Sequence, residues 1–232
     1  MKIAHIRKQN TTKLEIIQTA SKMFIENGYS NTSLRAISKE MDISPGHLMF
    51  YFSSKEHLLS MLVDILCNFQ WKLISEEGKD GVDPLLAICL ELMTMASAAE
   101  TDEIARDFFV SAYTSPLTLE IIRKNDYIRA KQVFSEFCPD WTDDDFKEAE
   151  GLVSGIEFAT LMKTESSAPL EKRISGALDM LMKIYNVPED IRKENIEKVL
   201  SRDYTSMGSK VFQYFKSYIE EENEQAFEEI LK

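Results

Sequence analysis

The fold is decided by residues 12–59, which read TKLEIIQTASKMFIENGYSNTSLRAISKEMDISPGHLMFYFSSKEHLL. The capping-box pair Thr12 and Glu15 predicts a helix that begins at Lys13, because these side chains can satisfy backbone N–H groups at a helix start. Gly28 is placed to end this helix in the left-handed conformation. The apolar face of the helix is formed by residues at helical spacing, Ile17, Ala20 and Phe24.

Two shorter helices follow within the same stretch. Thr32 or Ser33 can cap the second helix. Asp42 stands where a tight turn needs a residue that tolerates the left-handed region. Ser44 can cap the third helix, with Pro45 at its first position, where a missing N–H costs nothing. The sequence therefore predicts three closely connected helices.

The third helix is short and has an unusual outward side. At about 100° per residue, Leu48 and Phe52 fall on one side, where they can seat the helix on the first two. The other side carries no charge and consists of Gly46, His47, Met49 and Phe50. A second helix that presents its N-terminal half after a tight turn fits the helix-turn-helix pattern for DNA. The spacing alone also fits an ordinary helical bundle.

The same stretch resembles the TetR-type family of bacterial regulators. The family pattern combines Ile-x-x-Ala-x-x-x-Phe-x-x-x-Gly-Tyr, then Thr-Ser/Thr-apolar-x-x-Ile, then Gly-apolar-Ser-x-Gly-x-Leu-Tyr-x-His/Tyr-Phe-x-x-Lys-x-x-Leu. The matching residues are Ile17, Ala20, Phe24, Gly28, Tyr29, Thr32, Ser33, Leu34, Ile37, Ile43, Ser44, Gly46, Leu48, Tyr51, Phe52, Lys55, Glu56 and Leu58. The match covers about a quarter of the chain.

The chain departs from the family pattern at two positions. Asp42 replaces the glycine of the turn, and Met49 replaces a tyrosine that in the family typically reaches a phosphate. A methionine side chain cannot donate a hydrogen bond. Either one phosphate contact is missing, or Tyr51 supplies it.

The resemblance implies an all-α protein with a helix-turn-helix head and a larger helical body for ligand binding and dimerisation. We divide the chain accordingly into a flexible basic arm (1–10), the DNA-binding head (11–56) and the body (57–232). The residues expected to contact double-stranded operator DNA are Thr32, Ser33, Arg35, Ser44, Pro45, Gly46, His47, Met49, Phe50, Tyr51 and Lys55. Among them, Lys55 and Thr32 are expected to hold phosphates.

The charge of the chain is divided unevenly along its length. The net charge is −12, but residues 1–60 hold eight Lys and Arg against five Asp and Glu, a net of +3. The other 172 residues hold 19 basic against 34 acidic side chains, a net of −15. Positive charge at one end suits phosphate binding there, and the acidic remainder should point away from DNA.

Cysteine usage and hydropathy favour a cytoplasmic protein without a membrane span. Cys67, Cys89 and Cys138 are widely spaced in apolar surroundings, which indicates buried thiols rather than a disulfide or zinc framework. A thiol-sensing role is a minor alternative. No run of 18 apolar residues and no export signal is evident in the sequence. We expect no metal site and no cofactor.

The remainder of the sequence predicts further helices and no strand. A capping box at Ser53 and Glu56 predicts a long helix to about residue 75, followed by a loop over 76–82. Further helices are predicted over 83–100, 101–113, 116–137, 142–163, 169–185, 188–202 and 211–230. A break is expected at 205–208, the last residue of which is Gly208. We infer no function for the last two helices.

Small residues form a stripe on the helix predicted over 142–163. Gly151, Gly155 and Ala159 recur every four residues, and each interior glycine costs about 1 kcal/mol relative to alanine. Close approach of another helix would offset that cost. The resemblance implies a homodimer at this point, and the expected interface residues are Gly151, Gly155, Ala159, Ile174, Leu178 and Leu181. Packing within one chain is the alternative.

The middle helices are rich in methionine and aromatic residues. These side chains suit a cavity for an apolar or aromatic small molecule, and the resemblance implies such a cavity. The expected lining is Met93, Met95, Phe108, Phe109, Tyr113, Phe158 and Met162. We therefore predict a repressor that a small-molecule effector releases from operator DNA.

Three other functions compete with a ligand-released repressor. An enzyme is disfavoured because the three histidines all lie within the first 57 residues and no nucleophile elbow or phosphate loop occurs. We therefore expect no catalytic residues. An acidic helical scaffold that binds only proteins would leave the helix-turn-helix pattern unexplained. An activator or a co-repressed regulator would share the same sequence pattern.

Overall fold

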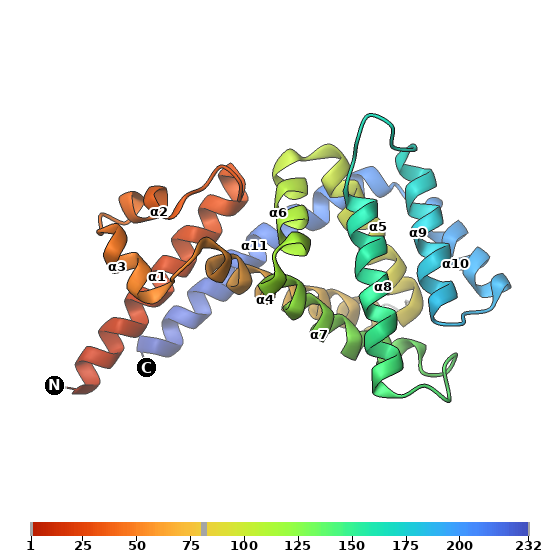
Figure 1. The fold of residues 1–232 in the computed structure, drawn as a ribbon, viewed down its shortest axis with the longest axis horizontal. Helices are drawn as coiled ribbons and strands as arrows, with labels where there is room; N and C mark the ends of the chain where they lie inside the picture. The colour runs from red at the N-terminus through yellow and green to blue at the C-terminus, as the bar shows by residue number, and fades with distance from the viewer. Residues whose placement is uncertain (1, 80–82, 232) are drawn as a thin grey trace.

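The computed structural model describes residues 2–79 and 83–231, and side chains within 11–73 and 83–221. Within those residues it has eleven helices and no strand, which confirms the all-α prediction (Figure 1). The helices are α1 (Lys2–Asn27), α2 (Leu34–Glu40), α3 (Pro45–Tyr51), α4 (Lys55–Lys79), α5 (Pro84–Thr101), α6 (Glu103–Thr114), α7 (Pro116–Phe134), α8 (Asp143–Leu161), α9 (Leu170–Ile184), α10 (Glu189–Leu200) and α11 (Tyr204–Leu231).

Helices α1 to α3 form the head, and local sequence signals explain their boundaries. Gly28, at φ 88°, ends α1, and Asp42, at φ 53°, makes the turn between α2 and α3. The Ser33 side chain caps α2 by accepting the Ala36 N–H, so Ser33 rather than Thr32 is the cap. The Ser44 side chain caps α3 in the same way.

Three predicted boundaries are wrong, and in each case a helix extends over residues that were expected to lie outside it. α1 begins at Lys2 instead of Lys13. α4 runs to Lys79, over residues expected to form a loop, and α11 includes Gly208. A capping box or a glycine permits a helix to end, but packing along the rest of the helix decides whether it does.

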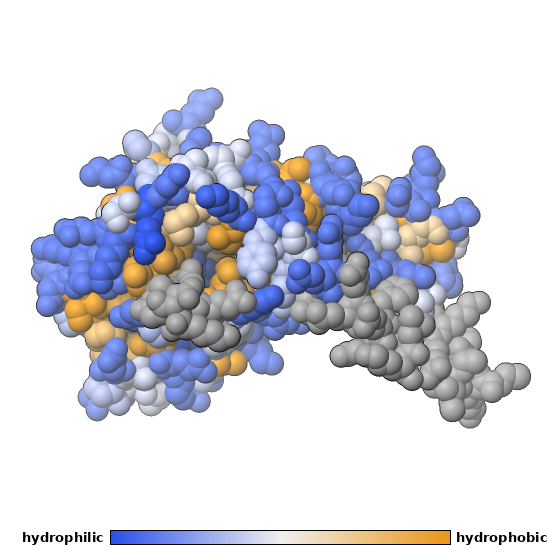
Figure 2. Space-filling view, turned by 180° about the vertical axis from the view of Figure 1, so that it is seen from behind, coloured by the Kyte–Doolittle hydropathy of each residue, from blue (hydrophilic) through white to orange (hydrophobic). Residues whose placement is uncertain are grey.

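The body is built around α5, and most of its residues are buried. Residues 84–101 are long and apolar enough to cross a membrane, but 72% of that stretch is buried inside the protein. The core helix of a water-soluble protein has the same character. The side of the molecule behind the view of Figure 1 is largely hydrophilic, with smaller apolar patches between the charged side chains (Figure 2).

The last helix connects the body to the head. α11 packs along α5 and runs back to α1 and α4 (Figure 1). Gly208 permits the close approach to α5, since a Cβ there would lie 2.6 Å from Ser97 Cβ and 2.7 Å from Ala98 N. One apolar core joins α11 residues such as Phe215 to head residues such as Phe24. The head is therefore packed against the body.

Candidate DNA interface and effector cavities

Helix α3 presents the uncharged face that the sequence predicts. Leu48 and Phe52 are buried against the head, whereas His47, Met49 and Phe50 are exposed. Phe50 is 73% exposed, which is unusual for a large apolar side chain. Its ring contacts Tyr51 edge-on at a centroid distance of 5.2 Å. A short, capped helix therefore displays aromatic and apolar groups to the outside.

The polar residues expected at DNA divide into exposed and buried ones. Ser33, Arg35 and Ser44 are exposed at the starts of α2 and α3. Thr32 is only 2% exposed, and its hydroxyl donates to the Gly28 carbonyl oxygen at 2.8 Å. The predicted phosphate contact of Thr32 is therefore wrong for this structure, because its hydroxyl satisfies the end of α1.

Lys55 lies at the start of α4 and contacts the turn after α1. Its Nζ donates to the Tyr29 carbonyl oxygen at 2.9 Å and lies 3.9 Å from the centre of the Tyr29 ring. Burial lowers the pKa of Lys55. An ammonium has three N–H donors, so one contact with Tyr29 leaves two for another acceptor.

Helices α8 and α9 each carry small and apolar residues among their exposed positions. A Cβ added at Gly151, Gly155 or Gly176 would meet no atom within 4 Å. Beside these glycines, Leu152 is 59% exposed and Met180 is 49% exposed. The glycine stripe does not pack within the described part of the chain.

Three residues predicted for the dimer interface belong instead to the core of the protomer. Ile174, Leu178 and Leu181 are buried, and they join the cluster around α5 and α8. Their helical spacing identified an apolar face of α9 correctly. That face is covered by the same chain, and the exposed residues of α9 include Gly176 and Met180 beside Lys172 and Lys183.

The seven residues predicted to line one pocket do not surround one cavity. Met95 and Phe109 line an apolar cavity between α4, α5, α6 and α11. Met93 is fully buried in the other core cluster, and Met162 borders an open depression beside the head. The other three residues lie in the core around α6 and α8, and none of them lines the apolar cavity: Phe108, Tyr113 and Phe158.

The apolar cavity measures about 30 Å³ in this state. Its walls include Phe69 from α4 and Phe212 and Phe215 from α11. A volume of this size holds at most a few water molecules, whereas sites for small organic ligands measure roughly 300–1,000 Å³. An effector could enter only if the surrounding helices separated.

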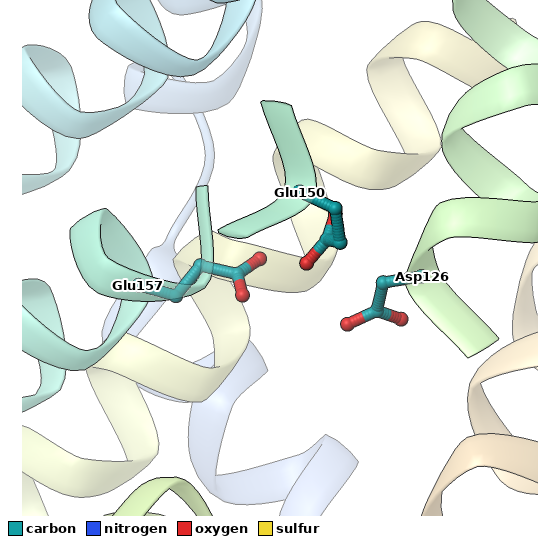
Figure 3. Close-up of side chains that lie close together, drawn as sticks. All are labelled: Asp126, Glu150 and Glu157. Carbon is teal, nitrogen blue, oxygen red and sulfur yellow. The ribbon is translucent and has the colours of Figure 1, made fainter. Parts of the chain in front are cut away.

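A second cavity of about 30 Å³ is polar and was not predicted from the sequence. Asp126 on α7 and Glu150 and Glu157 on α8 point toward one another there (Figure 3). The Arg129 guanidinium beside them pairs with Glu91 and with Asp126. Burial raises the pKa of Asp126 to about 6 and that of Glu157 to about 8.

One signal in the sequence could have revealed this cluster. Glu150 and Glu157 are seven residues apart, and they share a helix face with the apolar residues Phe146 and Val153. Acidic residues on an otherwise apolar face are unusual, because burying an isolated carboxylate costs several kcal/mol. The contribution of Asp126 from another helix could not be read from spacing.

Comparison with known sequences relates the head to one family. Residues 16–62 match the sequence model described as bacterial regulatory proteins, tetR family. The chain is 54% identical over 48 residues to the uncharacterized HTH-type transcriptional regulator YuxN of Bacillus subtilis, a match that covers 20% of this chain and 16% of YuxN. It is 26% identical over 110 residues to the HTH-type transcriptional regulator HbdR of Aromatoleum, covering 47% of each protein.

Solved structures extend the similarity to the fold of most of the chain. RolR in complex with resorcinol superposes with a TM-score of 0.65 at 17% identity, covering 83% of this chain and 95% of RolR. Thermus thermophilus FadR, a TetR-family repressor in complex with lauroyl-CoA, gives a TM-score of 0.54 at 15% identity, covering 76% and 96%. These structures share the fold of this chain.

The sequence matches are confined mainly to the head. The matched regions span from about a sixth to about half of the length of YuxN and HbdR. The tetR-family sequence model matches the second half of α1, all of α2 and α3 and the start of α4. The fold similarity covers the head and body together. Residues 16–62 of this chain are therefore similar to the head of the tetR family of bacterial regulatory proteins.

Proposed function

We propose that this protein is a transcriptional regulator that binds operator DNA through α3 and responds to a small molecule bound in its body. The observation that carries the proposal is the exposed face of α3, where Met49 and Phe50 project from a helix seated by Leu48 and Phe52. In a helix-turn-helix, such a face enters the major groove, and apolar groups contact thymine methyl groups.

Phosphate contacts would surround this face. The exposed Ser33, Arg35 and Ser44 lie at helix starts, where backbone N–H groups also face an anion. Lys55 would add the two N–H donors that Tyr29 leaves free. The positive net charge of residues 1–60 supports this orientation, with the acidic body away from DNA.

We also propose that two copies associate through the outer face of α8 and α9. Gly151, Gly155 and Gly176 leave room for another helix, and Leu152 and Met180 would be buried by it. A two-fold dimer would present two α3 helices to successive major grooves, about 34–36 Å apart. Specific recognition would depend on that spacing.

The apolar cavity between α4, α5, α6 and α11 is the proposed effector site. It connects to the head in two ways, because α4 follows the head directly and α11 packs on α1. An apolar or aromatic effector would separate these helices and change the spacing of the two heads. An effector that binds the changed spacing more favourably by about 3 kcal/mol would weaken DNA binding about 100-fold. The protein would then act as a repressor in the cytoplasm.

Enrichment of binding sites from random duplex DNA tests the proposal. The expected result is a two-fold symmetric site with half-sites separated by about one helical turn or a multiple of it. Absence of DNA binding even at low salt would favour the acidic protein-binding scaffold and overturn the proposal. The enriched duplex then serves to screen two classes of compound for release of DNA. One class is aromatic compounds such as resorcinol, and the other is acyl-CoA thioesters.

Linkage distinguishes an effector-released repressor from the alternatives. If an effector weakens operator binding, operator DNA must weaken effector binding by the same factor. Tighter DNA binding with effector would instead indicate a co-repressed regulator or an activator. Equal effector affinity with and without operator would contradict the proposed coupling.

A further inference from the structure

The acidic cavity between α7 and α8 holds more negative charge than its surroundings balance. Among the described side chains, it gathers four carboxylates around a single cation, the guanidinium of Arg129. Two of them, Glu91 and Asp126, pair with Arg129. The carboxylates are Glu91, Asp126, Glu150 and Glu157. With all four ionised, the cluster would carry a formal charge of −3, which is costly inside a protein.

Glu150 provides an independent sign that a ligand belongs in this cavity. The residue is only 2% exposed and lines the cavity, and its Oε1 has no hydrogen-bond partner among the described residues. Its Oε2 lies 3.4 Å from the Tyr185 hydroxyl. A buried carboxylate oxygen without a partner loses the interactions that water would give it. An occupant of the cavity would restore them.

The arrangement of the oxygens fits a metal ion. One oxygen each from Asp126, Glu150 and Glu157 lies within 4.8 Å of the other two. Oxygens bound to one ion are at most twice the metal–oxygen distance apart, which is roughly 4–5 Å for Mg²⁺ or Ca²⁺. The three side chains come from two helices and converge on one space (Figure 3).

The size of the cavity distinguishes between a metal ion and an organic cation. About 30 Å³ accommodates an ion with one or two water molecules. The stacked rings of Phe134 and Tyr185, 4.2 Å apart, help to form its apolar wall. An organic ammonium ion of useful size would have to displace these packed rings. The three ligand atoms that converge there are carboxylate oxygens, which hard divalent cations prefer.

We propose that Asp126, Glu150 and Glu157 form a binding site for a hard divalent cation, Mg²⁺, Mn²⁺ or Ca²⁺. The cation neutralises the excess carboxylate charge and joins α7 to α8. The three carboxylates supply the protein ligands, and water completes the coordination shell. The inference does not depend on DNA binding, so its test needs no operator.

Cation binding at this site competes with protons. Carboxylates must be ionised to bind a metal, so affinity should rise from pH 6 to pH 8. Burial raises the pKa of all three carboxyl groups. The ionisable groups that surround or lie near them are Cys67 on α4, Glu91 on α5, Tyr113 on α6, Arg129 on α7 and Tyr185 after α9. Of these, only Arg129 is positively charged near neutral pH.

Calorimetric titration of the chelator-treated full chain with Mn²⁺, repeated with Mg²⁺ and Ca²⁺, tests the proposal. We expect one site per chain and a Mn²⁺ affinity at least ~10-fold weaker in Glu150→Gln. Glu148→Gln, an exposed acidic position on the same helix, should bind like the wild type. The absence of saturable binding at millimolar cation, or unchanged binding in Glu150→Gln, would overturn the proposal.

Thermal unfolding separates metal binding from a purely structural role of Glu150. Without cation, Glu150→Gln should unfold at the same or a higher temperature, because it removes a buried ionisable group. Added Mn²⁺ should raise the unfolding temperature of the wild type but not of this variant. Stabilisation by the polyamine spermidine, but by none of the three metal ions, would assign the site to an organic cation and contradict the proposal.

Discussion

Ser30, in the turn between α1 and α2, donates its backbone N–H to the Asp107 carboxylate on α6 at 2.8 Å, across 77 residues of sequence. The Ser30 hydroxyl donates to the other oxygen of the same carboxylate. Gly28 lies against this contact, since a Cβ there would be 3.0 Å from Asp107 Oδ2. Two residues further along α6, Phe109 lines the apolar cavity. Helix α6 therefore joins the proposed effector site to the head.

Asp107→Ala should loosen the head from the body without unfolding either. The Ser30 amide would lose its acceptor, so its hydrogen exchange should accelerate at least ~10-fold. Glu103→Ala, an exposed change on the same helix, serves as the control and should leave that amide unchanged. Unchanged exchange in Asp107→Ala would show that the contact does not hold the head in solution.

Gly208→Ala should destabilise the protein although it replaces a glycine within a helix. The added methyl group would lie 2.9 Å or less from Ser97 Cβ, Ala98 N and Thr94 O, so α11 would have to move away from α5. We expect a loss of about 1–3 kcal/mol in unfolding free energy. Ser209→Ala, at the exposed neighbouring position, should unfold within about 0.5 kcal/mol of the wild type. Equal stability of the two variants would contradict the close approach.

Gly155→Leu should convert a dimer into a monomer. The leucine has room in the protomer, where a Cβ at Gly155 meets no atom within 4 Å, so folding should be preserved. In the proposed dimer, the same side chain would hold the two copies apart. Light scattering measures the mass directly. A Glu197→Leu variant, with the same side chain added on the exposed side of α10, should keep the wild-type mass. If Gly155→Leu also keeps it, this face is not the interface.

The acidic cavity should make the cation-free protein less stable as pH rises from 6 to 9. Burial raises the pKa of Glu157 to about 8, so the folded chain holds a proton that the unfolded chain releases near pH 4–5. Raising the pH stabilises the state that binds fewer protons. Over this range that state is the unfolded chain, so the free energy of unfolding falls. The carboxyl groups of Glu100 and Asp179 have lowered pKa values and finish titrating below this range.

Glu157→Gln should reduce this loss of stability by on the order of 1 kcal/mol or more, since one pKa unit corresponds to about 1.4 kcal/mol. Denaturant unfolding at several pH values, in the presence of a chelator, provides the measurement. Glu148→Gln should follow the wild-type profile. A Glu157→Gln profile parallel to that of the wild type would show that Glu157 does not keep its proton in the folded state.

Local signals in the sequence predicted the head well. The turn at Asp42, the cap at Ser44 and the burial of Leu48 and Phe52 all depend on residues close together in the chain. Their physical causes are backbone conformation and hydrogen bonding within a few residues. The orientation of α3 followed from them, and the structure confirms it.

Features that depend on which helices meet could not be predicted in the same way. Helical spacing showed that Ile174, Leu178 and Leu181 form an apolar face, but not whether the same chain or another copy covers it. Gly208 gave a break signal in the sequence, whereas in the structure it permits contact between α11 and α5. The acidic cavity forms because Asp126 from α7 lies beside two residues of α8. The spacing of residues in the sequence does not predict that α7 and α8 place them together.

The most direct test of DNA recognition is the affinity of a Met49→Ala/Phe50→Ala variant for the enriched duplex and for a scrambled duplex. Both side chains are exposed, so the variant should fold like the wild type. Fluorescence anisotropy should show at least ~30-fold weaker binding to the enriched site, with binding to scrambled DNA and its salt dependence nearly unchanged. Equal affinity of wild type and variant for the enriched site would contradict the claim that α3 reads the operator.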